Sequence, residues 1–377
     1  MSRLRKILFF SVLFLFSGAF FINLFTPNLK AEEIIPNETV NFKAEVVEVT
    51  LSKSIERENG SFFTQQNLLL RGLEGIYKDK EIVYEGISEI EVTNSNLYKE
   101  GDKVFVDAYI DENGQETFYV VEFVRTNYLY ILIAIFIILV IIVGRLKGLK
   151  ALIGLALSFV VIIKFIIPQI LTGRDPFVIS LIGGLVILIL MIYITEGIKR
   201  ESHLAILSVF FSLLFILILS LIFTNLSKLT GLAQEEAIFL IGNGNLALNF
   251  KGLLLAGFII GAIGVLDDII VGQIETVVRL QEANPNLPAK KIFSLAYKVG
   301  NTHLGAIINT LFLTYAGAAL PLLLLFVLNQ SGGLTMSRVL NTEIISTEII
   351  RTLVGSIGVI MAMPIATFLG SFCKIKK

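Results

Sequence analysis

Long apolar runs dominate the chain from residue 128 onward. A transmembrane helix needs about 20 predominantly apolar residues, with a range of about 17–25. Seven stretches are long enough to span, of which six fall in this range and His303–Leu328 is slightly longer: Tyr128–Gly144, Leu149–Leu171, Pro176–Thr195, Leu204–Phe223, Gly252–Gly272, His303–Leu328 and Ile349–Phe372. An eighth run, Ile7–Phe25, follows three basic residues near the N terminus. The pattern therefore predicts a polytopic α-helical membrane protein with about eight transmembrane helices, in which residues 1–30 form an N-terminal anchor or a signal-like segment.

Residues 31–126 have a different pattern, with short segments that often alternate between polar and apolar positions. Such segments, bounded by turn residues, are typical of β-strands. We expect five: Phe42–Leu51, Gln65–Arg71, Glu81–Tyr84, Val104–Ile110 and Thr117–Val124. Asn113-Gly114 predicts a hairpin between the last two. Five such strands favour a small β domain of the OB-barrel type, with a sandwich as the alternative.

Charge separates the two regions and orients them. Residues 31–126 hold 9 Lys/Arg and 20 Asp/Glu, whereas the other 281 residues hold 22 and 11. With the N terminus inside, fifteen basic residues fall in cytoplasmic segments and five in short outer loops. This positive-inside bias predicts a multi-pass protein of the bacterial plasma membrane with both termini cytoplasmic and the β domain extracytoplasmic. The membrane domain, 127–377, has an outer interfacial segment at 234–251 and a cytoplasmic loop at 273–300.

Composition narrows the function classes. The chain is 55% hydrophobic with a mean hydropathy of +0.80, which fits residence in a lipid bilayer. It has no HExxH, Gly-x-Ser-x-Gly, phosphate-loop or Cys/His-cluster motif, so we expect no enzyme, no cofactor and no metal site. No basic stripe points to nucleic acid. The single cysteine, Cys373, excludes an intramolecular disulfide.

The stretch Gly252–Gly272 carries the first candidate site. Gly257, Gly261, Gly264 and Asp268 recur at steps of four, three and four residues, so they share one side of a helix, here called the glycine face. Small residues allow a second helix to approach closely, and a carboxylate facing lipid is costly. We therefore expect the three glycines to pack against another helix and Asp268 to point into the bundle. Asp267, one step of about 100° away, is expected nearer the cytoplasmic surface.

Other polar residues inside spans extend this candidate site. Asn309, Thr310 and Thr314 lie in the His303–Leu328 stretch, at a depth similar to that of Asp268. His303 begins that stretch, where an interfacial or capping role is the alternative to ligand binding. Lys164 lies in the outer half of Leu149–Leu171, where it either is buried or reaches the outer surface. Intramembrane polar residues mark functional sites by default.

Three motifs resemble a known family. They are GAIGVLDDIIVGQ (261–273), HLGAIINTLFLTYAGAALPLLLLF (303–326) and LNTEIISTEIIRTLVGSIGVIMAMPI (340–365). Together with the N-terminal anchor, the β domain and GDKV at 101–104, they are similar to the YibE/F-like bacterial membrane proteins over nearly the whole chain. That family has Gly-Arg-Asp where this chain has Gly300-Asn301-Thr302, so no role of an Arg-Asp pair carries over. The resemblance implies an architecture and no activity.

Two functions follow from these patterns. The first is a permease or channel for an ion or small polar solute, whose path is lined by the helix of Asp268 and the helix of Asn309 and Thr310. The second is a membrane scaffold without transport, which binds partners through the outer β domain and through a cytoplasmic protein docked at 273–300. Flux through the purified protein distinguishes the two.

Overall fold

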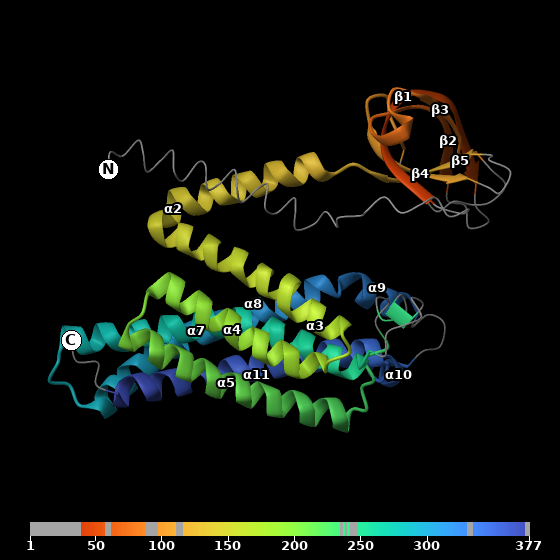
Figure 1. Cartoon of the computed structure of the whole chain (residues 1–377). Coiled ribbons are helices and arrows are strands. Elements are labelled where there is room, and N and C mark those ends of the chain that lie inside the picture. The colour runs from red at the N-terminus through yellow and green to blue at the C-terminus, as the bar shows by residue number, and fades with distance from the viewer. Residues whose placement is uncertain are drawn as a thin grey trace, which may run out of the picture. The chain divides into compact units, whose positions relative to one another are not determined.

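The computed structural model describes residues 39–56, 62–87, 97–110, 116–233, 237, 240–241, 248–329 and 335–373. The predicted N-terminal anchor and most of the predicted interfacial segment, 234–251, lie outside these ranges. The chain divides into two compact units between Ile133 and Ala134. The first holds the β domain and the second holds the helices (Figure 1).

All five predicted strands are present. They are β1 (Thr39–Glu56), β2 (Phe62–Gly72), β3 (Glu81–Glu85), β4 (Lys103–Ile110) and β5 (Glu116–Phe123). They form one antiparallel sheet in the order β3-β2-β1-β4-β5. Strand β1 pairs on both sides, and its register against β2 shifts between Val46 and Glu48. Such irregularities bend a strand and increase its twist, which lets β1 serve both neighbours.

Alternation along the strands builds the core of the β domain. Every second residue is buried from Phe42 to Val46 in β1 and from Val104 to Ala108 in β4. Tyr77, from a short 3-10 turn after β2, stacks on the Phe42 ring at a centroid distance of 4.5 Å. The sheet is not closed, because no pairing joins β3 to β5 among the described residues. The structure therefore confirms a small antiparallel sheet domain, whereas the closed OB barrel is not confirmed.

The second unit is helical. Its elements are α2 (Thr126–Val161), which starts in the first unit, the π-helix η2 (Ile162–Ile166), α3 (Ile167–Leu171), α4 (Pro176–Glu196), α5 (Arg200–Leu226), α7 (Phe250–Ala283), α8 (Ala289–Ala318), α9 (Leu320–Asn329), α10 (Met336–Leu340) and α11 (Glu343–Phe372). Pro168 lacks an N–H, and its ring crowds the carbonyl four residues earlier, at Lys164. The wider π turn at η2 accommodates this proline.

Five helical runs in the described ranges are long and apolar enough to cross a membrane: Thr126–Leu171, Pro176–Glu196, Arg200–Leu226, Phe250–Ala283 and Glu343–Phe372. The first contains two of the predicted spans, because the helix loses helical geometry only at Arg145 (φ 50°, ψ −129°). The predicted span His303–Leu328 is divided between α8 and α9 at Ala319, just before Pro321. The structure thus confirms several membrane-type helices, and eight spans are not confirmed.

Helix α7 is the centre of the bundle. It packs against α4, α5, α8 and α11, and α4, α5, α7 and α11 run side by side (Figure 1). Its buried side is built from large aliphatic residues such as Ile259, Leu266 and Ile270. Close contacts between helices occur where glycines face these residues: an added Cβ at Gly184 of α4 would overlap the Ile263 side chain. The central position of this stretch agrees with its long apolar sequence.

The N-terminal ends of α4 and α7 are joined by a chain of hydrogen bonds. Asp175 caps α4, and its Oδ1 accepts from the Phe177 amide at 2.9 Å. Asn249 caps α7 by accepting from the Gly252 amide at 2.9 Å, and its own Nδ2 donates to Asp175 Oδ2 at 3.1 Å. One carboxylate therefore serves two helix starts.

The predicted cytoplasmic loop 273–300 is mostly helix. Helix α7 continues to Ala283, and α8 begins at Ala289 after a short turn. The apolar side of the first part of α8, at Ile292 and Ala296, packs against Val277 of α7. The apolar side of this segment is therefore covered by α7.

Candidate functional site

The glycine face of α7 points out of the described bundle. Gly257, Gly261, Gly264 and Asp268 are all exposed, whereas the opposite side of α7 is buried. Among the described residues, no heavy atom lies within 4 Å of a Cβ added at Gly257 or Gly264. At Gly261 the neighbour is the Tyr315 hydroxyl, 3.2 Å from such a Cβ. The expected close packing along this face is therefore absent from the described part of the chain.

The exposure of the two aspartates is the reverse of our expectation. Asp268 is exposed and makes no hydrogen bond or ion pair with any described residue. Asp267 is half-buried, and its buried Oδ1 has no hydrogen-bond partner within the described ranges. It lies within electrostatic range of Glu196 at the end of α4. The physical reason is the packing of α7: the side that turns toward α4 is covered, and the glycine face is not.

Two contacts fix the level of α8 along α7. At one end, Gln273 Nε2 of α7 donates to the Ala296 carbonyl of α8 at 2.8 Å. At the other, Tyr315 of α8 reaches Gly261 of α7. The two helices are therefore antiparallel, and both Asp268 and residue 309 lie between these levels. This slice is about 18 Å thick along α7 and about 28 Å along α8, so the rise of a helix does not place Asp268 and residue 309 at the same height.

The polar residues of α8 in this slice lie on its exposed side. Asn309, Thr310 and Thr314 are all exposed. The Thr310 hydroxyl donates to the Ala306 carbonyl at 2.9 Å, and the Thr314 hydroxyl donates to the Thr310 carbonyl at 2.7 Å. Both hydroxyl protons are thus used within α8. The Asn309 amide has no partner in the described part of the chain, and it forms no hydrogen bond with Asp268.

The remaining sequence candidates stand apart from the aspartates. Lys164 is exposed on the π turn η2, and it forms no ion pair with Asp267 or Asp268 in the described structure. His303 is exposed in the first half of α8. Neither residue contributes a charge partner to the half-buried Asp267 carboxylate.

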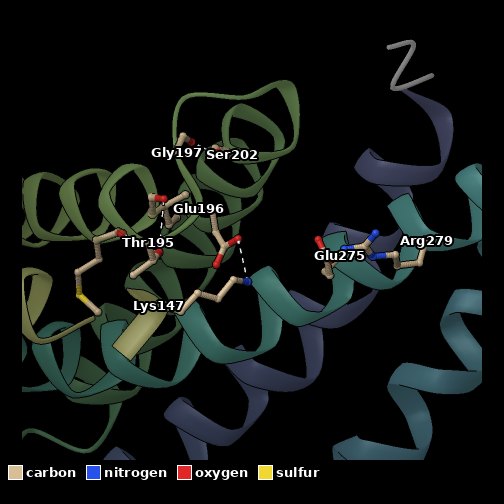
Figure 2. Close-up of polar contacts among 9 residues, drawn as sticks. Lys147, Thr195, Glu196, Gly197, Ser202, Glu275 and Arg279 are labelled. Carbon is tan, nitrogen blue, oxygen red and sulfur yellow. Dashed lines mark hydrogen bonds and ion pairs between the residues drawn. The ribbon is translucent and has the colours of Figure 1, made fainter. Parts of the chain in front are cut away.

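Residues from four helices line an open cavity of about 670 Å³ at the end of the bundle where α4 ends and α5 begins. Its lining is Leu146, Lys147, Lys150, Thr195, Glu196, Lys199, Arg200, Glu201, Glu275, Val278, Arg279 and Glu282. Figure 2 shows Lys147 and Glu196 pointing toward each other, with Nζ and Oε2 3.8 Å apart. Arg279 pairs with Glu275 at 2.7 Å on the same helix. Exposed pairs of this kind contribute little to stability, so they can open at low cost.

An ion pair that our sequence analysis did not single out lies in α11. Arg351 Nη1 is 2.9 Å from Glu348 Oε1, and the two side chains are only 22% and 23% exposed. The guanidinium also lies over the Phe258 ring of α7, 5.4 Å from its centroid. Opposite charges three residues apart on a helix are the signal that identifies such a pair.

Gln273 is a second residue that the sequence analysis passed over. It is buried, and its Nε2 donates to the Thr367 hydroxyl at 2.7 Å as well as to Ala296. It therefore joins α7, α8 and α11 at one point. A polar residue directly after an apolar helical stretch is the sequence signal for such a joint.

These groups allow cation or proton binding. Among the residues that the structure describes, no three His, Cys, Asp or Glu side chains gather in a way that holds a metal ion. Asp267 is a carboxylate without a donor, and a carboxylate in that position attracts a cation, water or a proton.

Comparison with known proteins identifies a family. The family described as YibE/F-like protein matches residues 132–376, which is the greater part of the chain. No curated protein and no solved structure matches the chain.

Proposed function

Because the chain belongs to the YibE/F-like protein family, and its apolar helices suit a lipid bilayer, we propose that it is a permease or channel for an ion or small polar solute. The observation that carries this proposal is the half-buried Asp267 with its unpartnered Oδ1 on the most buried of the membrane-type helices. An ionisable residue in such a helix is costly to keep and marks a path by default.

The path follows α7, with polar groups at three levels. Glu348 and Arg351 lie beside Phe258, the aspartates follow about 14 Å further along the helix, and Glu275 about 12 Å beyond Asp267. The cavity between α2, α4, α5 and α7 is the inner mouth, and Glu196 connects its lining to Asp267. Since the unpaired groups in the middle of this path are carboxylates, cations are the first solutes to test.

The proposal retains the predicted topology. Both termini lie in the cytoplasm of a bacterium, and the β domain lies outside the plasma membrane. The antiparallel order β3-β2-β1-β4-β5 supports an OB-like ancestry for the β domain, since closing β3 against β5 would complete that barrel.

Flux assays on liposomes that contain only this protein test the function. We expect cation-dependent uptake that falls at least tenfold in Asp267→Asn and less in Asp268→Asn, because only the former carboxylate is half-buried. Size-exclusion profiles of both variants serve as the folding control. Equal flux in the wild type and Asp267→Asn contradicts the proposed path.

The alternative is a scaffold that does not transport, and one observation favours it. Tyr109 and Tyr119 form an exposed edge-to-face pair on β4 and β5, with ring centroids 5.4 Å apart. Exposed aromatic residues are enriched in protein interfaces. Flux without any partner protein excludes the scaffold as the sole function, whereas a silent liposome together with capture of a partner by the β domain supports it.

A further inference from the structure

The charges that line the open cavity of about 670 Å³ are divided between its walls. Four of the basic side chains come from α2 and from the connection that leads from α4 into α5: Lys147, Lys150, Lys199 and Arg200. The remaining one, Arg279, lies on α7, where it pairs with Glu275 at 2.7 Å and with Glu282 at 3.0 Å. The carboxylates of the α7 wall are therefore held by their own arginine and not by the basic residues opposite.

Two of the cavity lysines have no ionic partner in the described part of the chain. Glu196 is engaged by Lys147, and Glu201 lies in the first turn of α5, where the helix amides stabilise a carboxylate. Lys150 and Lys199 form no ion pair with any described residue. The pair of Lys147 with Glu196 is 3.8 Å long and the lysine side chain is 81% exposed, so this pair opens at low cost. The cavity therefore presents ammonium groups that are available to an added anion.

The surroundings of these lysines are apolar. Lys199 lies in the short connection between α4 and α5, two helices that are long and apolar enough to cross a membrane, so it lies at the membrane surface. Leu146 directly precedes Lys147 and is 73% exposed, and Ile198 directly precedes Lys199 and is 79% exposed. Each of these two lysines thus has an exposed aliphatic neighbour. A free phosphate ion would use the lysines and leave the aliphatic side chains uncovered, whereas a lipid would cover both.

We propose that this cavity binds the headgroup of an anionic phospholipid, with Lys150 and Lys199 contacting its phosphate and Leu146 and Ile198 contacting its acyl chains. Basic pockets between transmembrane helices on the cytoplasmic side bind anionic headgroups, and the topology proposed above places the cavity on that side. In the proposed cation path, the bound phosphate offsets positive charge that would otherwise repel cations from the inner mouth. That consequence rests on the proposed function, whereas the lipid binding itself does not.

Lipid binding to the purified full-length protein tests the proposal. Fluorescent phosphatidylglycerol and fluorescent phosphatidylcholine are titrated into the protein in a non-ionic detergent. We expect phosphatidylglycerol to bind about tenfold more tightly, because its headgroup carries a net negative charge and that of phosphatidylcholine does not. Excess inorganic phosphate at constant ionic strength should displace little of it. Equal binding of the two lipids indicates non-specific uptake, and displacement by inorganic phosphate indicates a site for the free ion; either result overturns the proposal.

Substitutions of single lysines test the assigned contacts. Lys150→Gln and Lys199→Gln should each weaken phosphatidylglycerol binding about fivefold, which is the effect of one basic group near an anionic membrane surface. Lys150→Arg keeps the charge and should retain binding. Lys298→Gln removes the same charge from an exposed position of α8 outside the cavity, and this matched control should leave the affinity nearly unchanged.

Size-exclusion profiles show whether each variant is folded. Equal weakening by Lys150→Gln and Lys298→Gln indicates general attraction to a basic surface, and the proposal is then wrong. The assay measures no flux, so its failure is separate from failure of the proposed function.

Discussion

Gly300 lies where α8 packs closely against α7 and α11. A Cβ added at this position would lie 2.6 Å from Gln273 Oε1 and 2.9 Å from Met363 Cγ. Gly305, on the same helix, has open space around its Cα. We predict that Gly300→Ala destabilises the protein whereas Gly305→Ala does not, so the pair separates steric crowding from the intrinsic helix preference of alanine.

The magnitude follows from three contributions. Alanine is better than glycine inside a helix by about 1 kcal/mol, and this gain is common to both variants. Overpacking a close contact costs about 1–3 kcal/mol. Displacing Gln273 also weakens its bonds to Ala296 and Thr367, which in membrane proteins average about 0.6 kcal/mol each. We therefore expect the free energies of unfolding of the two variants to differ by about 2–4 kcal/mol, with Gly300→Ala the less stable.

Unfolding of the purified protein in mixed micelles, followed by circular dichroism, measures this difference. Gln273→Ala provides an internal check, because neighbouring substitutions are not additive. Without the Gln273 side chain, the cost of Gly300→Ala should fall by about half, with the remaining crowding due to Met363. Equal stability of Gly300→Ala and Gly305→Ala would refute the close packing of α7, α8 and α11 around Gln273.

Three further predictions concern other parts of the chain. Gly358→Ala should lower the free energy of unfolding by about 1–3 kcal/mol in the same assay, because its Cβ would overlap a side chain of α5, whereas Gly355→Ala, with open space, should not. Burial and nearby negative groups raise the pKa of Tyr98 to about 12. The protonated phenol therefore contributes its full stabilisation below about pH 10, and this contribution is lost between about pH 10 and 12. In alkaline unfolding followed by tyrosinate absorbance, the free energy of unfolding of Tyr98→Phe should fall by about 2–3 kcal/mol less than that of the wild type. Reporter fusions should place Asn113 outside the cytoplasm and Asn286 inside it. A cytoplasmic signal from the fusion at Asn113 would show that the predicted topology is reversed.

The β domain was predictable because its strands combine two local signals. Alternating side chains specify which face is buried, as at Phe42, Ala44 and Val46, and turn residues mark the ends. Closure of a barrel depends instead on pairing between the distant strands β3 and β5, which no local pattern encodes. The sheet order was consequently beyond the sequence argument.

The orientation of α7 was not predictable for a different reason. Both of its sides are suitable for packing in a membrane: one through large aliphatic residues such as Leu266, the other through glycines. Tertiary contacts with α4, α5, α8 and α11 select the aliphatic side. Because adjacent residues differ by about 100°, this choice exchanges the roles expected for Asp267 and Asp268.

The division between α8 and α9 is indicated in the sequence by a proline, which the prediction of one continuous span did not take into account. Pro321 has no N–H and its ring crowds the carbonyl of Gly317, and the helix is interrupted between these residues at Ala319. The joint at Gln273 had a weaker signal, since a single polar residue after an apolar stretch also fits a membrane surface. Whether Gln273 is buried between helices or lies at the membrane surface depends on its contact with Thr367, almost a hundred residues away.

The shared cap at Asp175 and Asn249 sets a common starting line for two helices. From that line, Glu196 lies about 30 Å along α4 and Asp267 about 22 Å along α7, counted from Pro176 and Gly252. The two carboxylates therefore stand about 8 Å apart in height, close enough to influence each other and too far apart to share a proton. The hydrogen bond between the two caps at one end of the bundle thus sets the distance between the two carboxylates near the other end.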